Sequence, residues 1–166
     1  MSATISYSNL FTYSAEDPSE RVPVENLMDG DNHVHGHLQI EINGRALPHM
    51  GFFGPDDVCF NAWVQELSNV LRELGVGAVS TYTFDEGEQG QPAFQFRRAE
   101  GRLFVSVVDS PLSDAAGDPE FQNVSCAWSE FVAAASNFFA SFRADLLERC
   151  PSAGDNWWRK NGHAVV

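Results

Sequence analysis

The chain has 166 residues, of which 43% are hydrophobic, so it is long enough and apolar enough to form one domain with a sizeable core. Its 23 acidic residues face only 10 basic residues, which gives a formal net charge of -13. This charge repels the phosphates of nucleic acids and anionic lipids. We therefore expect neither a nucleic acid nor a membrane as a partner.

Targeting signals are not visible in the sequence. The opening stretch MSATISYSNLF lacks the basic region and apolar run of a secretory signal, and no window of about 18 residues is apolar enough to span a membrane. The three cysteines, Cys59, Cys126 and Cys150, show no CxxC spacing and are expected to be free, mostly buried thiols. These features predict a cytoplasmic protein, and nothing in the chain calls for a cofactor.

The first third of the chain predicts strands separated by loops. Residues 5–11 alternate in polarity and predict a strand, whereas residues 14–32 are rich in proline and acidic residues and predict a surface loop. A clearer strand is expected over 34–42, where apolar and polar residues alternate. Asn43-Gly44 suits a type I′ turn, so we expect a hairpin with a return strand over 45–50.

An amphipathic helix is expected next. Pro55-Asp56-Asp57 predicts its start, because proline suits the first helical position and acids suit the positive end of the helix dipole. Apolar side chains then recur every three or four residues up to Leu74, and Gly75 is expected to form a left-handed C-cap. The stripe predicts a helix packed against a sheet.

Residues 79–110 are rich in Val, Thr, Tyr and Phe and predict three consecutive strands. A short turn at 99–101 joins the strands over 94–98 and 102–108, and a wide acidic loop at 85–92 precedes them. We expect this three-strand region to organise the rest of the fold.

The last third predicts a fourth strand over 120–126 and a second helix. Ser129 is a good N-cap for this helix, and Pro151 is expected to end it. The aromatic tail at Trp157-Trp158 is expected to fold back onto the domain. Residues 1–166 are thus predicted to form a single α+β domain, with a mainly antiparallel sheet and two amphipathic helices packed on one face.

The sharpest local pattern is His33, His35 and His37, three histidines at alternate positions. In an extended segment their side chains share one face and offer the nitrogen ligands that zinc accepts. Such positions are about 6.5 to 7 Å apart, which is wide for three ligands on one ion. No cysteine lies close in the sequence to complete a site, although Asp29, Asp31 and His49 are further candidate ligands. A polar strand end is the simpler interpretation, and a small metal-binding enzyme or binding module is the alternative function.

No motif for catalysis is visible, because the chain lacks GxSxG, HExxH, a phosphate-binding loop and a dinucleotide fingerprint. Cys59 lies near the expected helix N-terminus, but it also lies beside the apolar stripe, which favours a buried and unreactive thiol. Glu86 and Glu88 form a carboxylate pair, although a glycine-rich loop is a poor place to raise a pKa. We therefore predict that the protein is not an enzyme.

Acidic residues gather in two loops, one after the first and one after the third of the three central strands. Because both strands run in the same direction, the two loops are expected at the same end of the sheet. The predicted partner-binding residues are Asp85, Glu86, Glu88, Asp109, Asp114, Asp118 and Glu120. Like charges so close together cost stability, and a positively charged partner would relieve that cost and be steered toward this edge. The alternative is a scaffold or adaptor domain whose acidic surface serves only solubility.

The segments EGEQGQPAFQF, VSVVDSPLS and FQNVSCAWSEFVAAASNFF resemble the small, acidic, cytoplasmic immunity proteins of bacterial polymorphic-toxin and interbacterial competition systems. The likeness covers the layout of residues 36–150, and those proteins share no catalytic motif. It implies tight binding to one cognate toxin domain, often a basic nuclease, whose activity is blocked. Exposed aromatic residues would supply much of the affinity; the candidates are Phe52, Phe53, Trp157 and Trp158.

Overall fold

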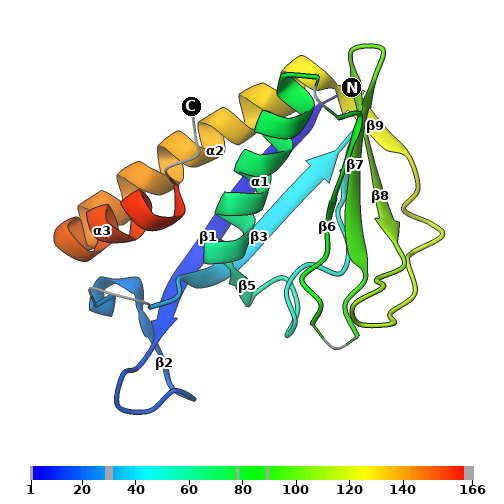
Figure 1. The fold of residues 1–166 in the computed structure, drawn as a ribbon. Helices are drawn as coiled ribbons and strands as arrows, with labels where there is room; N and C mark the ends of the chain where they lie inside the picture. Colours follow the sequence, from blue (N-terminus) through cyan, green and yellow to red (C-terminus); the bar gives the residue numbers. More distant parts are fainter. Residues whose placement is uncertain (1, 29–31, 78, 89, 163–166) are drawn as a thin grey trace.

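The computed structural model describes residues 2–28, 32–77, 79–88 and 90–162 (Figure 1). Two antiparallel sheets and three α-helices form an α+β fold. The α+β class and the antiparallel pairing are as the sequence predicts, but the prediction has one sheet and two helices. The elements are β1 (Ala3–Tyr13), β2 (Arg21–Pro23), the 3-10 helix η1 (Val24–Asn26), β3 (His35–Ile42), β4 (Arg45–Ala46), β5 (Val58–Cys59), α1 (Phe60–Gly75), β6 (Thr81–Phe84), β7 (Ala93–Ala99), β8 (Arg102–Val108), β9 (Val124–Ala127), α2 (Trp128–Arg149) and α3 (Pro151–Asn161).

The first sheet has the strand order β2-β1-β3-β4, and β5 also pairs with β3. The long strand β1 is antiparallel to β3, from Ala3 opposite Ile42 to Phe11 opposite His35, with an irregularity at Asn9, where φ is 53°. Its other edge pairs with β2 only from Phe11 to Tyr13. The strand β3 is therefore the centre of this sheet, and its first residues lie beside β5.

The second sheet is the predicted meander, in the order β6-β7-β8-β9 with every pair antiparallel. Glu100 and Gly101 join β7 to β8 with φ values of 50° and 73°, as a tight hairpin turn requires. The loop before β7 and the loop after β8 consequently lie at the opposite end of this sheet (Figure 1). A hydrogen bond from the guanidinium of Arg45 in β4 to the carbonyl of Glu120 connects the first sheet to the loop between β8 and β9.

The helices α1 and α2 cover one side of the sheets, and the core is aromatic (Figure 1). On α1, the Trp63 ring lies edge-on to Phe84 at 5.0 Å and to Phe94 at 5.1 Å between ring centroids, which attaches the helix to β6 and β7. On α2, the Phe142 ring stacks on Phe60 of α1 at 4.8 Å. The two helices therefore share one core with both sheets.

A third helix, α3, is not in the sequence prediction. Pro151 ends α2 as expected, but it also occupies the first turn of α3, a position where proline is well tolerated. Gly154 lets α3 approach α2 closely, because a Cβ there would lie 2.7 Å from the Leu146 carbonyl oxygen. Trp157 and Trp158 are 3% and 8% exposed, so the tail does fold back onto the domain.

The predicted start of α1 is wrong. Pro55-Asp56-Asp57 is not helical, and α1 begins at Phe60 after the two-residue strand β5. Asp57 is buried, where it accepts hydrogen bonds from other segments, and β5 pairs with β3. Tertiary pairing thus overrides the local preference for a helix N-terminus.

Other boundaries differ by a few residues. The Asn43-Gly44 turn is present, with φ values of 54° and 75°, but the return strand β4 covers only two of the six residues expected. At the end of α1, the left-handed residue is Gly77 rather than Gly75. Asn123 has a φ of 51°, so β9 begins after it instead of at residue 120. The loop over 14–32 contains β2 and η1.

Among the described residues, no helix combines the length and apolar character needed to cross a lipid bilayer.

Candidate functional site

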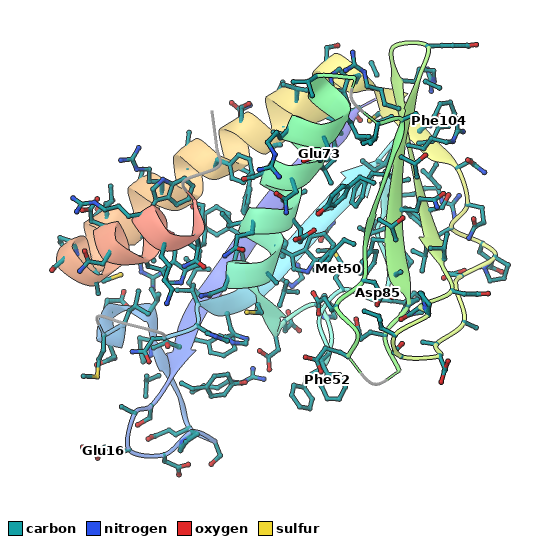
Figure 2. All side chains as sticks on the ribbon, viewed as in Figure 1. Glu16, Met50, Phe52, Glu73, Asp85 and Phe104 are labelled. Atoms are coloured by element: carbon teal, nitrogen blue, oxygen red, sulfur yellow. The ribbon has the colours of Figure 1, made fainter. Side chains whose placement is uncertain are left out.

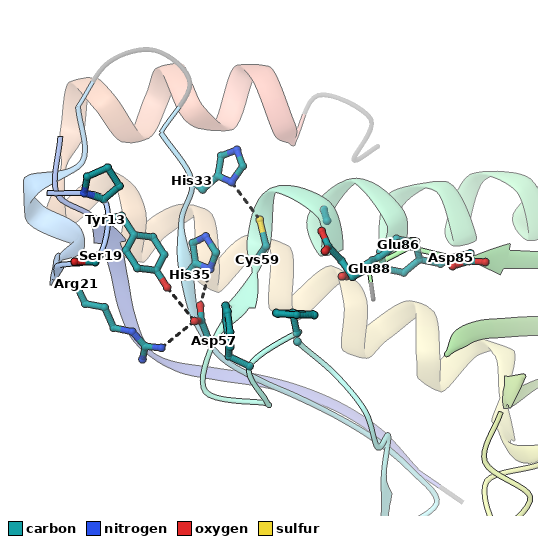
Figure 3. A pocket seen from close by; sticks show the side chains of 16 residues that line it. Tyr13, Ser19, Arg21, His33, His35, Asp57, Cys59, Asp85, Glu86 and Glu88 are labelled. Atoms are coloured by element: carbon teal, nitrogen blue, oxygen red, sulfur yellow. Dashed lines mark hydrogen bonds and ion pairs between the residues drawn. The ribbon is translucent and has the colours of Figure 1, made fainter. Parts of the chain in front are cut away.

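A cavity of about 1050 Å³ opens at one end of the domain (Figure 3). It is lined by side chains from β1 and the loop after it, from the start of β3, from the 51–59 segment and from the 84–88 segment. Phe52 and Asp85 lie toward this end, whereas Phe104 and Glu73 lie toward the other (Figure 2). The cavity therefore brings together polar residues from four separate parts of the chain.

Asp57 is the most connected polar residue in the cavity. Its side chain is only 2% exposed, and it accepts hydrogen bonds from the Tyr13 hydroxyl at 2.9 Å and from Arg21 Nη2 at 2.8 Å. Its other oxygen lies 2.7 Å from Nδ1 of His35. Because an ionised carboxylate only accepts, Nδ1 of His35 carries the proton and Nε2 keeps its lone pair.

His33, His35 and Cys59, which we call the His-Cys cluster, lie next to this network. Their ligand atoms all lie within 4.8 Å of one another. Cys59 is opposite His35 in the β3-β5 pairing, and its sulfur lies 3.8 Å from Nδ1 of His33. The two imidazole rings stack with a centroid separation of 6.0 Å.

The structure changes the ligand set that the sequence suggests. His37 points to a different partner, since its Nδ1 lies 2.7 Å from the exposed carboxylate of Asp56, and it is not part of the cluster. Cys59 takes its place, although it lies 24 residues beyond His35 in the chain. The sequence misses this ligand because β5 falls within the helix that Pro55-Asp56-Asp57 predicts. Of the further candidates, His49 contacts Asp118 instead, and Asp29 and Asp31 lie outside the described residues.

Cys59 lacks the surroundings of an activated nucleophile. Burial raises the pKa of its thiol, and the negative charges of Glu86 and Asp57 raise it further. Backbone N–H groups at the start of α1, those of Ala62 and Asn61, oppose the shift only in part. The pKa of the adjacent His35 is lowered by burial, against the pull of Asp57. Cys59 and His35 therefore both favour their neutral forms, the thiol and the neutral imidazole.

The two acidic loops do lie side by side at one end of the second sheet. The Ser110 hydroxyl donates to Asp85 at 2.8 Å, and Gly87 faces the side chain of Leu112. Two further carboxylates cap their own loop, because Asp109 accepts from the Gly117 amide and Asp118 from the Glu120 amide. Asp118 also lies 3.0 Å from Nε2 of His49. The predicted residues that remain exposed are Glu88, Asp114 and Glu120, with Asp109 also exposed.

Glu86 differs from the expectation for a glycine-rich loop. Its pKa is raised from 4.5 to about 7, mainly by burial against the cavity wall and then by the charge of Glu88. The neighbouring Trp63 offsets only part of this rise in the pKa of Glu86. The Trp63 indole N–H makes no well-formed hydrogen bond with any described residue. The loop folds inward at this point, which the sequence does not indicate.

Two of the four candidate aromatic anchors are exposed. Phe52 is 45% exposed and Phe53 is 74% exposed, and both line the cavity mouth with their rings edge to face at 4.6 Å. Trp157 and Trp158 pack against the Phe142 ring inside the core, so they are not available to a partner. The accessible aromatic surface at this site is therefore the Phe52-Phe53 pair.

Comparison with known proteins identified no relative of this chain. No protein-family model, no curated protein and no solved structure matches the chain. The fold defines the class, an α+β protein with two antiparallel sheets and helices on one side. Its function has to be argued from the cavity and its rim.

Proposed function

We propose that this chain is an immunity protein, which binds a cognate bacterial toxin domain in the cytoplasm and neutralises it without catalysis of its own. The observation that carries the proposal is the cavity mouth, where two exposed phenylalanines lie beside a carboxylate-rich loop in a chain of net charge -13. Aromatic anchors surrounded by charge are typical of tight protein interfaces. The likeness of the central segments to acidic immunity proteins points the same way.

The rim suits an arginine or lysine side chain from a basic partner. Glu88 supplies negative charge at the cavity, Glu86 adds to it when a bound cation favours its ionised form, and Phe53 offers an exposed aromatic ring in the same lining. A cation near an aromatic ring gains about 0.5–2 kcal/mol, more when both groups lose water. The overall negative field would speed association by steering, while the phenylalanines would slow dissociation.

The chemistry of the cavity favours binding over turnover. The one cysteine that lines it has a raised thiol pKa, and the buried Asp57 is already engaged by three groups. Neither group is poised as a nucleophile or a general base. Glu86 does have a pKa suited to proton exchange, but its carboxyl lies close to Glu88, where a cationic side chain of a partner could pair with both. A non-catalytic role is therefore the simpler proposal for this site.

The test first looks for a toxin-like domain in the upstream reading frame and then co-expresses that domain with this chain. The protein should restore growth of cells that make this toxin, and the purified pair should form a stoichiometric complex. Association measured by stopped flow should slow steeply as salt rises from about 50 to 500 mM, because charge steering is screened. Normal toxicity in the presence of folded, abundant protein would contradict the proposal.

A variant with one charge removed distinguishes electrostatic steering of the partner from direct contact at the cavity rim. Glu88→Gln should lower the association rate about threefold at low salt and leave the dissociation rate nearly unchanged. The matched control is Glu100→Gln, an exposed residue in the β7-β8 turn at the opposite end of the sheet. If both variants slow association equally, the partner responds to net charge alone and the cavity rim is not its docking site.

A further inference from the structure

The geometry points to a zinc site formed by His33, His35 and Cys59, with Asp57 positioning His35. The site lies on the inner wall of the cavity and does not depend on the proposed partner. Two imidazole nitrogens and one thiolate form a ligand set that suits zinc. Magnesium and calcium instead take oxygen ligands. Three protein ligands leave a fourth position open to solvent.

The distances fit one ion. Tetrahedral zinc with bonds of about 2.3 Å to sulfur and 2.0–2.1 Å to nitrogen places those two atoms about 3.6 Å apart. The separation between Cys59 Sγ and His33 Nδ1 is 3.8 Å, and the widest ligand separation in the cluster is below 4.8 Å. A small rotation of the side chains therefore brings all three ligands to bonding distance.

Asp57 provides the support that zinc-bound histidines usually have. A ligating histidine commonly donates its second ring nitrogen to a carboxylate, which fixes the tautomer and the ring orientation. The 2.7 Å contact from Nδ1 of His35 to the buried Asp57 leaves Nε2 for the metal. Tyr13 and Arg21 hold the other oxygen of that carboxylate, so it cannot rotate freely.

The backbone that carries the ligands is also held in place. The amide of Val34, between the two histidines, donates to the Asn61 side chain at 2.9 Å, and the Phe60 amide donates to the Val34 carbonyl at 2.8 Å. These bonds tie the start of β3 to the start of α1, on either side of the cluster. Folding therefore assembles the ligand set before any ion arrives, which lowers the entropic cost of binding.

The charge around the cluster favours a dication. Asp57, Glu86 and Glu88 line the same cavity, and Arg21 is the only cationic side chain among the described residues that line it. The His33 side of the cluster is exposed to solvent, so an ion can enter without rearrangement of the core. A bound zinc would neutralise part of the acidic wall.

The test uses the full chain without a histidine tag, reduced and stripped of metal. Titration with zinc against a chromophoric chelator should give one tight site per chain, and the thermal midpoint should rise when zinc is added. Cobalt(II) at the same site should show a thiolate-to-metal absorption band together with the intense visible bands of tetrahedral coordination. Absence of both signals would overturn the proposal.

Variants assign the ligands. Cys59→Ser should abolish the thiolate band, and His33→Gln should weaken zinc binding about 100-fold or more, whereas Asp57→Asn should weaken it about 10- to 100-fold. His37→Gln is the matched control, because it removes an imidazole from the same strand outside the cluster. Far-UV circular dichroism shows whether each variant is folded. Equal loss of zinc binding in His37→Gln, or unchanged binding in folded Cys59→Ser, would overturn the assignment.

Discussion

Phe142→Ala is expected to lower the free energy of unfolding by about 3–5 kcal/mol, because it empties the centre of the aromatic core. Phe142 is fully buried, and its ring lies 4.8 Å from Phe60 of α1, 5.3 Å from Tyr7 of β1 and 5.6 Å from Trp157 of α3, between centroids. Removing it leaves a cavity shared by four elements. Urea unfolding followed by circular dichroism measures the loss as a lower midpoint.

The matched control is the same substitution at an exposed site. Phe53→Ala removes an identical side chain that is 74% exposed, so it should change the free energy of unfolding by less than about 0.5 kcal/mol. Comparing Phe142→Ala with Phe53→Ala therefore separates the effect of burial on stability from the effect of residue type. Similar losses in the two variants would mean that the core is not arranged around Phe142.

Glu86→Gln is expected to stabilise the protein above neutral pH and to have almost no effect near pH 4.5. The pKa of Glu86 is about 7 in the folded state against an ordinary value of 4.5, so the folded state binds more protons between these values. Its contribution to stability is therefore lost as pH rises from 4.5 through 7. Glutamine is uncharged, so it avoids that loss.

The gain at pH 8 should be about 2 kcal/mol, below the limit of roughly 3 kcal/mol that the pKa difference sets, because the cavity is open to solvent. Urea unfolding of both proteins at pH 5 and pH 8 measures it. Glu100→Gln, in the distant β7-β8 turn, should give no pH-dependent gain. A stabilisation of Glu86→Gln that is equal at both pH values would contradict the buried carboxyl.

The elements that the sequence predicts well are those with long local patterns. The alternation in β3, the three strands of the meander and the apolar stripe of α1 each extend over many residues, so periodicity identifies them. The side-by-side position of the two acidic loops follows from strand direction alone. Of the four candidate aromatic anchors, Phe52 and Phe53 are exposed, whereas Trp157 and Trp158 are buried because the tail folds back onto the domain.

The parts that the sequence does not predict depend on contacts between distant segments. Asp57 looks like a helix-start residue, yet its carboxylate is buried by Tyr13, Arg21 and His35. Cys59 joins the two histidines only because a two-residue strand pairs with β3. The short helix α3 has few apolar residues before its tryptophans, so no periodic pattern predicts it from the sequence.

The sequence therefore predicts only part of the candidate site. The sequence suggests His33 and His35 as ligands, but it adds His37, which contacts Asp56 instead. The acidic loop is expected from composition, whereas the inward turn of Glu86 is not, because it depends on burial against the cavity wall. Residue type predicts the kind of chemistry here, and the tertiary fold selects which residues meet.

The irregularity at Asn9 bears on how the molecule behaves at high concentration. Strand β1 pairs with β2 only from Phe11 to Tyr13, so the edge of β1 from Ala3 to Leu10 has no second strand beside it in the described part of the chain. Open edges of this kind template aggregation between copies. The left-handed backbone at Asn9 coincides with a shift in the β1-β3 register, as at a β-bulge, and this interruption shortens the regular run that another chain could join.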